Sequence, residues 1–262
     1  VTVPVANDAS LTGGTIQLRA KIDSEAYANL GSAYTIQGSD LGNNVTISNN
    51  AATLEALSAG VANTEVITVT AIITDTAANA TTGTASSTTL TVDQSAPTIS
   101  ETTAITTPAQ DTTPTVVITS DQAGAISCPS GQTLTGDVAA EAAANNVTFA
   151  ALDDGTYGSV TLRVTDAAGN PSNTLTLTSF TIDSTGPSAF TVGAVASTGG
   201  TVVANYLNST NTGVSVTVPV ANDASLVNGT IQLRAKFDSG SYQNVGSAAT
   251  ITDANTNQAV TL

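Results

Sequence analysis

Residues 153–170 read DDGTYGSVTLRVTDAAGN, and this stretch decides the fold. Its middle, Val160 to Thr165, alternates apolar and polar residues as a half-buried β-strand does, because successive side chains of a strand point to opposite faces. Asp, Gly and Asn, which favour turns, lie on both sides of it. Similar runs recur about every 8–15 residues, so the sequence predicts an all-β protein of antiparallel sandwiches. The Ala-rich run Ala139 to Ala144 is the exception and could form a single helical turn.

The composition favours thin cores. Of the 262 residues, 40% are hydrophobic but only 3% are aromatic, and there is no Trp or Met. Cores must therefore be built from Val, Ile, Leu and Ala, which suits small sandwiches better than one large globule with a deep pocket. The length is sufficient for two or three domains of ordinary size.

The charge and the missing residue types exclude several functions. Five basic residues face twenty acidic ones, for a net charge of −15. Nucleic acids and anionic membranes need Lys and Arg, so neither is an expected partner. No apolar run is long enough to span a membrane. The chain has no His and one cysteine, Cys128, so no disulfide can form within it and a cysteine nucleophile would lack its usual base. We expect Cys128 to be a small buried hydrophobe and the protein not to be an enzyme.

A long repeat organises the chain. Residues 1–47 align with residues 216–262 at an offset of 215, and 30 of the 47 aligned positions are identical. VTVPVANDASL opens both copies. Arg19 and Lys21 recur as Arg234 and Lys236, and we expect them to form an exposed stripe that pairs with the surplus acid. The alignment indicates a duplicated module.

A weaker repeat inside this period sets the domain boundaries. Residues 69–97 and 160–187 share the order strand, T-D-x-A-x-N turn, strand, Asp and Pro, and their terminal residues Asp93 and Asp183 are 90 positions apart. This spacing is about the length of one sandwich domain. It predicts tandem domains at 1–93, 94–183 and 184–262, in a linear array with short linkers.

The outer domains are expected to be incomplete. A segment at 184–215 precedes the repeat in the third domain, and nothing in the chain aligns with it ahead of Val1. The first domain would therefore lack its N-terminal strands, and the third its C-terminal strands. Either the chain is a window of a longer periodic polymer, which we favour because the 47-residue overlap exceeds a single strand, or neighbouring chains complete each other by strand addition. Both alternatives predict a fibre with an axial repeat of roughly 70–90 Å if the domains are extended.

The stretch Asp153 to Tyr157 fits D-x-G-x-Y, the tyrosine-corner signature of immunoglobulin folds, with Asp153, Gly155 and Tyr157 as its structural residues. Ser159 occupies the place of the usual cysteine. Together with VTLRVTDAAGN and FTIDSTGP, the motif resembles the bacterial Ig-like (Big-type) tandem repeats of large cell-surface adhesins. The resemblance implies an extracellular extender that spaces an adhesive tip from the cell or builds surface fibres. Its expected partners are neighbouring repeats of the same polypeptide or identical chains.

Many repeats of this family bind Ca²⁺ at domain junctions, and Ca²⁺ takes six to eight oxygen ligands. The residues that could supply them here are the two domain-terminal carboxylates and the polar residues of the T-D-x-A-x-N loops: Asp93, Asp183, Asp75 with Asn79, and Asp166 with Asn170. The alternative is that these loops are ordinary turns, in which Asp accepts backbone donors and Gly169 or Asn170 is left-handed. Adjacent Asp153 and Asp154 belong to the corner rather than to an acid–base pair.

Two functions remain open. The first is a structural extender or filament module. The second is an adhesin or carbohydrate-binding module that contacts a ligand directly, for which an exposed aromatic patch would be expected because sugars stack on aromatic rings.

Overall fold

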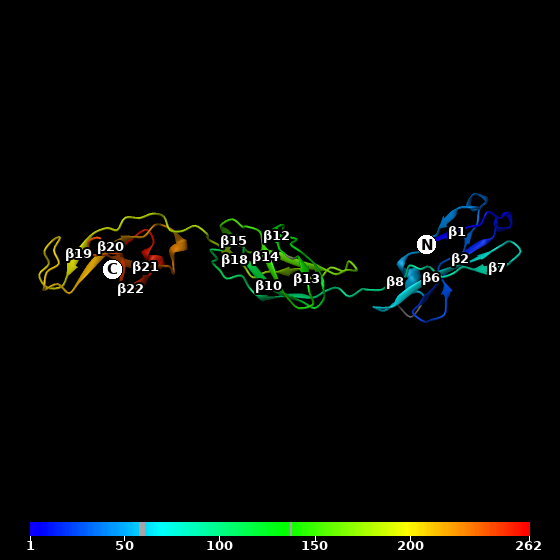
Figure 1. Cartoon of the computed structure of the whole chain (residues 1–262), viewed down its shortest axis with the longest axis horizontal. Coiled ribbons are helices and arrows are strands. Elements are labelled where there is room, and N and C mark those ends of the chain that lie inside the picture. Colours follow the sequence, from blue (N-terminus) through cyan, green and yellow to red (C-terminus); the bar gives the residue numbers. More distant parts are fainter. Residues whose placement is uncertain (58–60, 137) are drawn as a thin grey trace. The chain divides into compact units, whose positions relative to one another are not determined.

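The computed structural model describes the whole chain except residues 58–60 and 137. Strands account for 40% of the chain and helices for 6%, and the sheets are antiparallel, so the predicted all-β class is confirmed (Figure 1). The chain forms two compact units, residues 1–103, 117–147 and 160–177 in one and residues 104–116, 148–159 and 178–262 in the other. The three-domain division and the linear array remain predictions.

The N-terminal part of the first unit is built on one long ladder. Strands β2 (Thr15–Ile22) and β6 (Val66–Thr74) pair from Thr15↔Thr74 to Ile22↔Ile67. The short strands of the same sheet are β3 (Ala28–Asn29), β4 (Tyr34–Thr35), β7 (Ala80–Thr82) and β8 (Leu90–Thr91). A second sheet pairs β1 (Thr2–Pro4) with β5 (Asn44–Thr46). A single helical turn, α1 (Ala51–Glu55), follows β5 and begins at Asn50, whose side chain caps it; the sequence pattern did not predict it.

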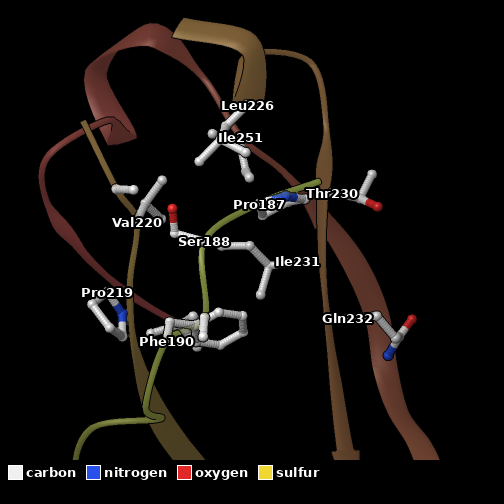
Figure 2. Close-up of a pocket in the computed structure, with 13 residues that line it drawn as sticks. Pro187, Ser188, Phe190, Pro219, Val220, Leu226, Thr230, Ile231, Gln232 and Ile251 are labelled. Atoms are coloured by element: carbon white, nitrogen blue, oxygen red, sulfur yellow. The ribbon is translucent and has the colours of Figure 1, made fainter. Parts of the chain in front are cut away.

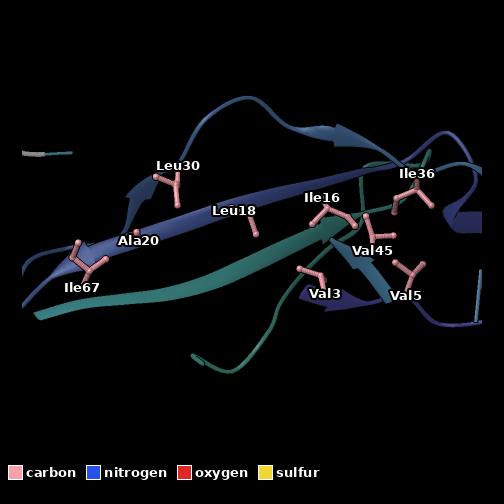
Figure 3. Packing of buried hydrophobic residues seen from close by; sticks show 9 residues of the cluster. All are labelled: Val3, Val5, Ile16, Leu18, Ala20, Leu30, Ile36, Val45 and Ile67. Carbon is pink, nitrogen blue, oxygen red and sulfur yellow. The ribbon is translucent and has the colours of Figure 1, made fainter. Parts of the chain in front are cut away.

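The core of this sandwich follows the two-residue period of the strands. Along β2 every second residue is buried, and Ile16, Leu18 and Ala20 are at most 1% exposed. They pack in one cluster with Val3 and Val45 of the facing sheet (Figure 3). Burying each of the larger side chains contributes about 1.5–3 kcal/mol, so the apolar face of β2 stabilises this sandwich.

Two four-stranded sheets lie between residues 99 and 176, and their strands again alternate buried and exposed positions. One has the order β12 (Leu134–Thr135), β14 (Ala144–Phe149), β10 (Thr115–Ser120) and β9 (Ile99–Thr103). The other has the order β13 (Ala139–Ala140), β11 (Gly124–Ser127), β16 (Thr161–Thr165) and β17 (Leu175–Thr176).

The helical turn suggested for Ala139 to Ala144 is not formed, so this prediction is wrong. Ala139–Ala140 forms β13, Ala144 begins β14, and a tight turn joins them. The Asn145 side chain holds that turn, because its Oδ1 accepts from the Glu141 N–H at 2.8 Å and its Nδ2 donates to the Ala143 and Glu141 carbonyl oxygens. A buried Asn that satisfies turn backbone thus overrides alanine's helical preference.

The second unit contains the hairpin-like pair β15 (Gly155–Tyr157) and β18 (Phe180–Ile182) and the C-terminal copy of the repeat. This copy has one sheet of β19 (Val195–Thr198), β20 (Gly213–Pro219) and β23 (Ala259–Thr261), and a pair of β21 (Thr230–Ala235) and β22 (Gln243–Thr250).

The sequence repeat is also a structural repeat. β1 pairs with β5 in the register Val3↔Val45. β20 pairs with β23 in the equivalent register, Val218↔Val260, at the same offset of 215 residues. The 3-10 turns at Ala9–Leu11 and Ala224–Leu226 are capped alike by Asp8 and Asp223.

The two copies differ in the strand pairing that the structure describes: β2 pairs with β6, and β21 pairs with β22. Leu18 is 1% exposed, whereas the equivalent Leu233 is only half-buried. Ile22 is 3% exposed, and the equivalent Phe237 is 92% exposed.

Candidate functional site: the corner and the linker clasps

The tyrosine corner positions the end of β15. The Tyr157 hydroxyl donates to the carbonyl oxygen of Asp153 at 2.9 Å. Its ring stacks on Phe180 of β18, with centroids 5.2 Å apart and planes 12° apart, and Phe180 is 1% exposed. Tyr157 itself is half-buried rather than fully buried, because its ring covers the core from the edge. Gly155 has φ +153°, a conformation that L side chains rarely adopt, which explains the glycine of the motif.

Asp154, the neighbour of the corner, binds the segment that follows β18, and we call this set of hydrogen bonds to Ser184 and Thr185 the Asp154 clasp. Its carboxylate accepts from the Thr185 hydroxyl at 2.6 Å, the Ser184 hydroxyl at 2.7 Å and the Ser184 N–H at 2.8 Å. The Thr185 hydroxyl, then the Ser184 donors, lower the pKa of Asp154 to about 2, because they stabilise the charged form. Sequence reasoning placed the junction role on Asp183 and missed Asp154. The only signal was the Ser-Thr pair directly after Asp183, about 30 residues from its partner.

The two T-D-x-A-x-N loops have the same geometry. Asp75 accepts from the Asn79 N–H and Nδ2, both at 2.8 Å, and Asp166 accepts from the Asn170 N–H at 2.8 Å and Nδ2 at 2.9 Å. The side-chain bond from the Asn is the first cause of the lowered pKa of each Asp. Ala78 and Gly169 take positive φ, +67° and +95°. The turn interpretation therefore accounts for every oxygen of both carboxylates.

One of these loops also binds the segment after β8. Asn170 Nδ2 donates to the backbone oxygen of Asp93 at 3.0 Å, while the Asp93 carboxylate accepts from the Ser95 N–H at 3.1 Å. Gln94 N–H donates to Asn63 Oδ1 at 2.6 Å, and Asn63 Nδ2 donates to Ser95 Oγ. Residues 93–95 are thus held from two sides, by Asn63 and by Asn170. Asn63 could not be identified from the sequence, because a single Asn in an Asn-rich chain belongs to no motif.

The predicted calcium ligands are brought together only in part. Asn170 joins Asp166 to Asp93, whereas Asp75 lies in its own turn with Asn79, and Asp183 N–H donates to the Ala109 carbonyl oxygen at 2.9 Å. Among the described residues no group of three or more His, Cys, Asp or Glu is placed to hold a metal ion. Calcium binding remains a prediction.

Three other side chains have environments that differ from the predicted ones. Lys21 Nζ is 5.6 Å from the ring centroid of Tyr27, and Lys236 Nζ is 5.3 Å from that of Tyr242, so each lysine of the stripe covers a tyrosine in a cation–π contact. Cys128 is half-buried, not buried, and its Sγ lies 3.3 Å from Ser130 Oγ.

The sandwich with its tyrosine corner defines an Ig-like fold. Residues 98–184 match the family model of the bacterial Ig-like domain, which confirms the resemblance, and this segment is a domain of that family. The match begins just before β9 and ends just after β18. No curated protein and no solved structure matches the chain. The family is non-catalytic and typical of surface proteins. Among the described residues no helix is long and apolar enough to cross a membrane.

Replacing Tyr157 by Phe should lower the free energy of unfolding of the bacterial Ig-like domain by about 1 kcal/mol, because the ring stack stays and only the hydroxyl bond to Asp153 is lost. Chemical denaturation followed by far-UV CD measures the change in the free energy of unfolding. The matched control is Tyr206→Phe: Tyr206 is 70% exposed, and its variant should stay within about 0.5 kcal/mol of the parent. Equal effects of the two changes would contradict the role of the corner.

The Asp154 clasp should depend on pH only in strong acid. Since its folded pKa lies below the usual 3.8, its contribution is complete above pH 4 and is lost as the pH falls through about 2. Carbon-13 NMR of the Asp154 carboxyl should show that low midpoint. In the double variant Ser184→Ala, Thr185→Val the midpoint should move up toward 3.8; a midpoint unchanged by removing both hydroxyl donors refutes the clasp.

Proposed function

We propose that the chain is a structural extender of a bacterial extracellular surface protein, whose Ig-like sandwiches are joined by short linkers held in place by hydrogen bonds. The observation that carries the proposal is that both linkers are bonded to loops of the sandwiches. Asn63 and Asn170 hold residues 93–95, and Asp154 holds Ser184 and Thr185. An extender must keep its two ends far apart. Linkers with little backbone freedom provide this property.

The bonding of the first linker extends beyond Asp93. Gln122 Nε2 donates to the Ser95 carbonyl oxygen at 3.2 Å, and the Asp121 carboxylate accepts from the Thr98 N–H at 2.7 Å. Pro97 between them is fully buried and has its φ fixed by its ring. Five of the six residues 93–98 are thus hydrogen-bonded or have a fixed φ, and these contacts restrict the linker without a bound ion. A Ca²⁺ ion at the junctions would stiffen it further and stays a secondary part of the proposal.

The alternative, direct binding of a carbohydrate, requires a platform of exposed aromatic rings. The exposed rings of the described residues are Phe190 and Tyr206, in the segment that precedes the C-terminal copy of the repeat, and Phe237 and Tyr242, within that copy. Phe190 lines a cavity with Pro187 and Pro219 (Figure 2), and the ring of Tyr242 lies beneath Lys236, so both rings already have contacts within the chain. The hydrogen bonds of the two linkers make the extender function the better supported of the two.

The two T-D-x-A-x-N loops offer a matched test of the linker. In Asn170→Ala the bond to the Asp93 carbonyl oxygen is lost, whereas Asn79→Ala removes the same local Asn–Asp bond from a loop for which the structure describes no linker contact. Spin labels on Cys128 and on a cysteine introduced by Ser87→Cys report the distance across residues 93–98 by double electron–electron resonance. We expect Asn170→Ala to broaden the distance distribution and Asn79→Ala to leave it narrow. Broad distributions in the unaltered chain would contradict a stiff linker.

A further inference from the structure

The bacterial Ig-like domain contains a parallel pairing beside its antiparallel ladders. Ala109 lies opposite Ile182 of β18 in a parallel bridge, whereas the ladders described for β10, β11 and β15 are antiparallel. Ala109 N–H donates to the Thr181 carbonyl oxygen, and the Ala109 carbonyl oxygen accepts from the Asp183 N–H, each at 2.9 Å. Thr181 N–H also donates to the Thr107 hydroxyl oxygen at 2.9 Å. We call these three hydrogen bonds the terminal pairing.

The terminal pairing joins the two ends of the domain directly. The family match spans residues 98–184, with β9 as its first strand and β18 as its last. Residues 107–109 follow β9, and residues 181–183 contain the end of β18. About 70 residues lie between the two paired segments in sequence. A pull on the ends of the domain therefore cannot extend these residues until the terminal pairing breaks.

The parallel direction decides how such a pull acts on the three bonds. Tension draws the N-terminal segment toward the start of the domain and the C-terminal segment toward its end. Because the two segments run in the same direction, these opposite pulls slide one along the other. The hydrogen bonds join the segments sideways, so the slide strains all three together. In a hairpin pulled at its two free ends, by contrast, the bonds open one after another.

The core holds both segments against sliding. On its other edge β18 pairs with β15, with Tyr157 opposite Phe180. Phe180 and Ile182 are each 1% exposed, and the ring centroid of Phe180 lies 6.2 Å from that of Phe149. Ile105, just before the N-terminal segment, is also buried. Movement of either segment along the other would expose these apolar side chains to water, which opposes it.

We infer that the terminal pairing is a mechanical clamp, which keeps the bacterial Ig-like domain folded while the chain is under tension. The inference rests on the proposed function for its biological role, because an extender is stretched between the cell and whatever its far end holds. The clamp itself is argued from the direction of the pairing and from the burial beside it. It predicts that resistance to force and resistance to heat depend on different hydrogen bonds of the domain.

The test is single-molecule force spectroscopy on the full chain. Force is applied through cysteines introduced by Ser87→Cys and Ser188→Cys, with Cys128→Ser to leave these as the only thiols. When the terminal pairing breaks, the released residues should add about 250 Å of length, at about 3.3–3.6 Å for each residue of extended chain. We expect this gain in one cooperative step, because the three bonds are strained together.

Asp183 provides a variant and its control at one position. Asp183→Pro removes the N–H that donates to Ala109, and it should lower the mean force of the step by about one third, in proportion to the one bond of three that is lost. Asp183→Ala keeps that N–H and should leave the force unchanged. Equal forces for the two variants would overturn the inference, as would the absence of a step of this length in the parent chain.

A pair of Thr→Val variants separates mechanical from thermal stability. Thr107→Val removes the hydroxyl of the terminal pairing, and Thr115→Val removes a hydroxyl that bonds Thr148 Oγ1 at 2.8 Å across the antiparallel strands β10 and β14. Thermal melts should show the two variants folded and similarly stable, while only Thr107→Val lowers the force. This pair decides the matter if Asp183→Pro does not fold, and equal forces refute the clamp. Failure of the proposed stiff linker is a separate result, because the spin-label distances across residues 93–98 do not involve the terminal pairing.

Discussion

The backbone groups at the edge of every strand need a hydrogen-bonding partner, and the rest of the structure depends on where that partner comes from. β2 obtains it from β6 along its whole length, and the resulting sheet buries Ile16, Leu18 and Ala20. β21 has the same sequence over most of its length but pairs only with β22 among the described strands, and its apolar side chains are partly or fully exposed. The burial of the apolar face of β2 therefore depends on its long pairing with β6.

Where strands end, polar side chains supply the hydrogen-bonding partners of the backbone. Asp75 and Asp166 close turns, Asp154 holds the segment after β18, and Asn63 and Asn170 hold the segment after β8. A chain with few aromatic residues cannot fix its linkers by burying large side chains. Its abundant Asp, Asn, Ser and Thr instead satisfy exposed backbone groups one by one, which is consistent with a net charge that is carried largely by hydrogen-bonded carboxylates.

Much of the fold could be predicted from the sequence, because it depends on patterns of short range. The alternation at Val160 to Thr165 predicted the half-buried strand β16. The 215-residue offset predicted a duplicated module, and β1 with β5 and β20 with β23 pair in matching registers. D-x-G-x-Y pointed to the bond between Tyr157 and Asp153. Two features could not be predicted, for different reasons. Asp154 binds residues about 30 positions away, and no local pattern marks such a partner. Asn145 has its partners within four residues, but its side-chain bonds to the turn override the helical preference of the surrounding alanines. The sequence also could not reveal that the carboxylates of Asp75 and Asp166, two of the expected calcium ligands, accept hydrogen bonds within their own turns.

The central claim is that side-chain hydrogen bonds hold the linker at residues 93–98. Amide hydrogen exchange of Gln94 and Thr98, resolved by NMR, measures this directly, because Gln94 N–H donates to Asn63 Oδ1 and Thr98 N–H donates to the Asp121 carboxylate. The account predicts that both amides exchange more slowly than in an unstructured peptide, and that Asn63→Ala releases Gln94 but not Thr98. Exchange of both amides at the rate of an unstructured peptide in the unaltered chain would contradict it.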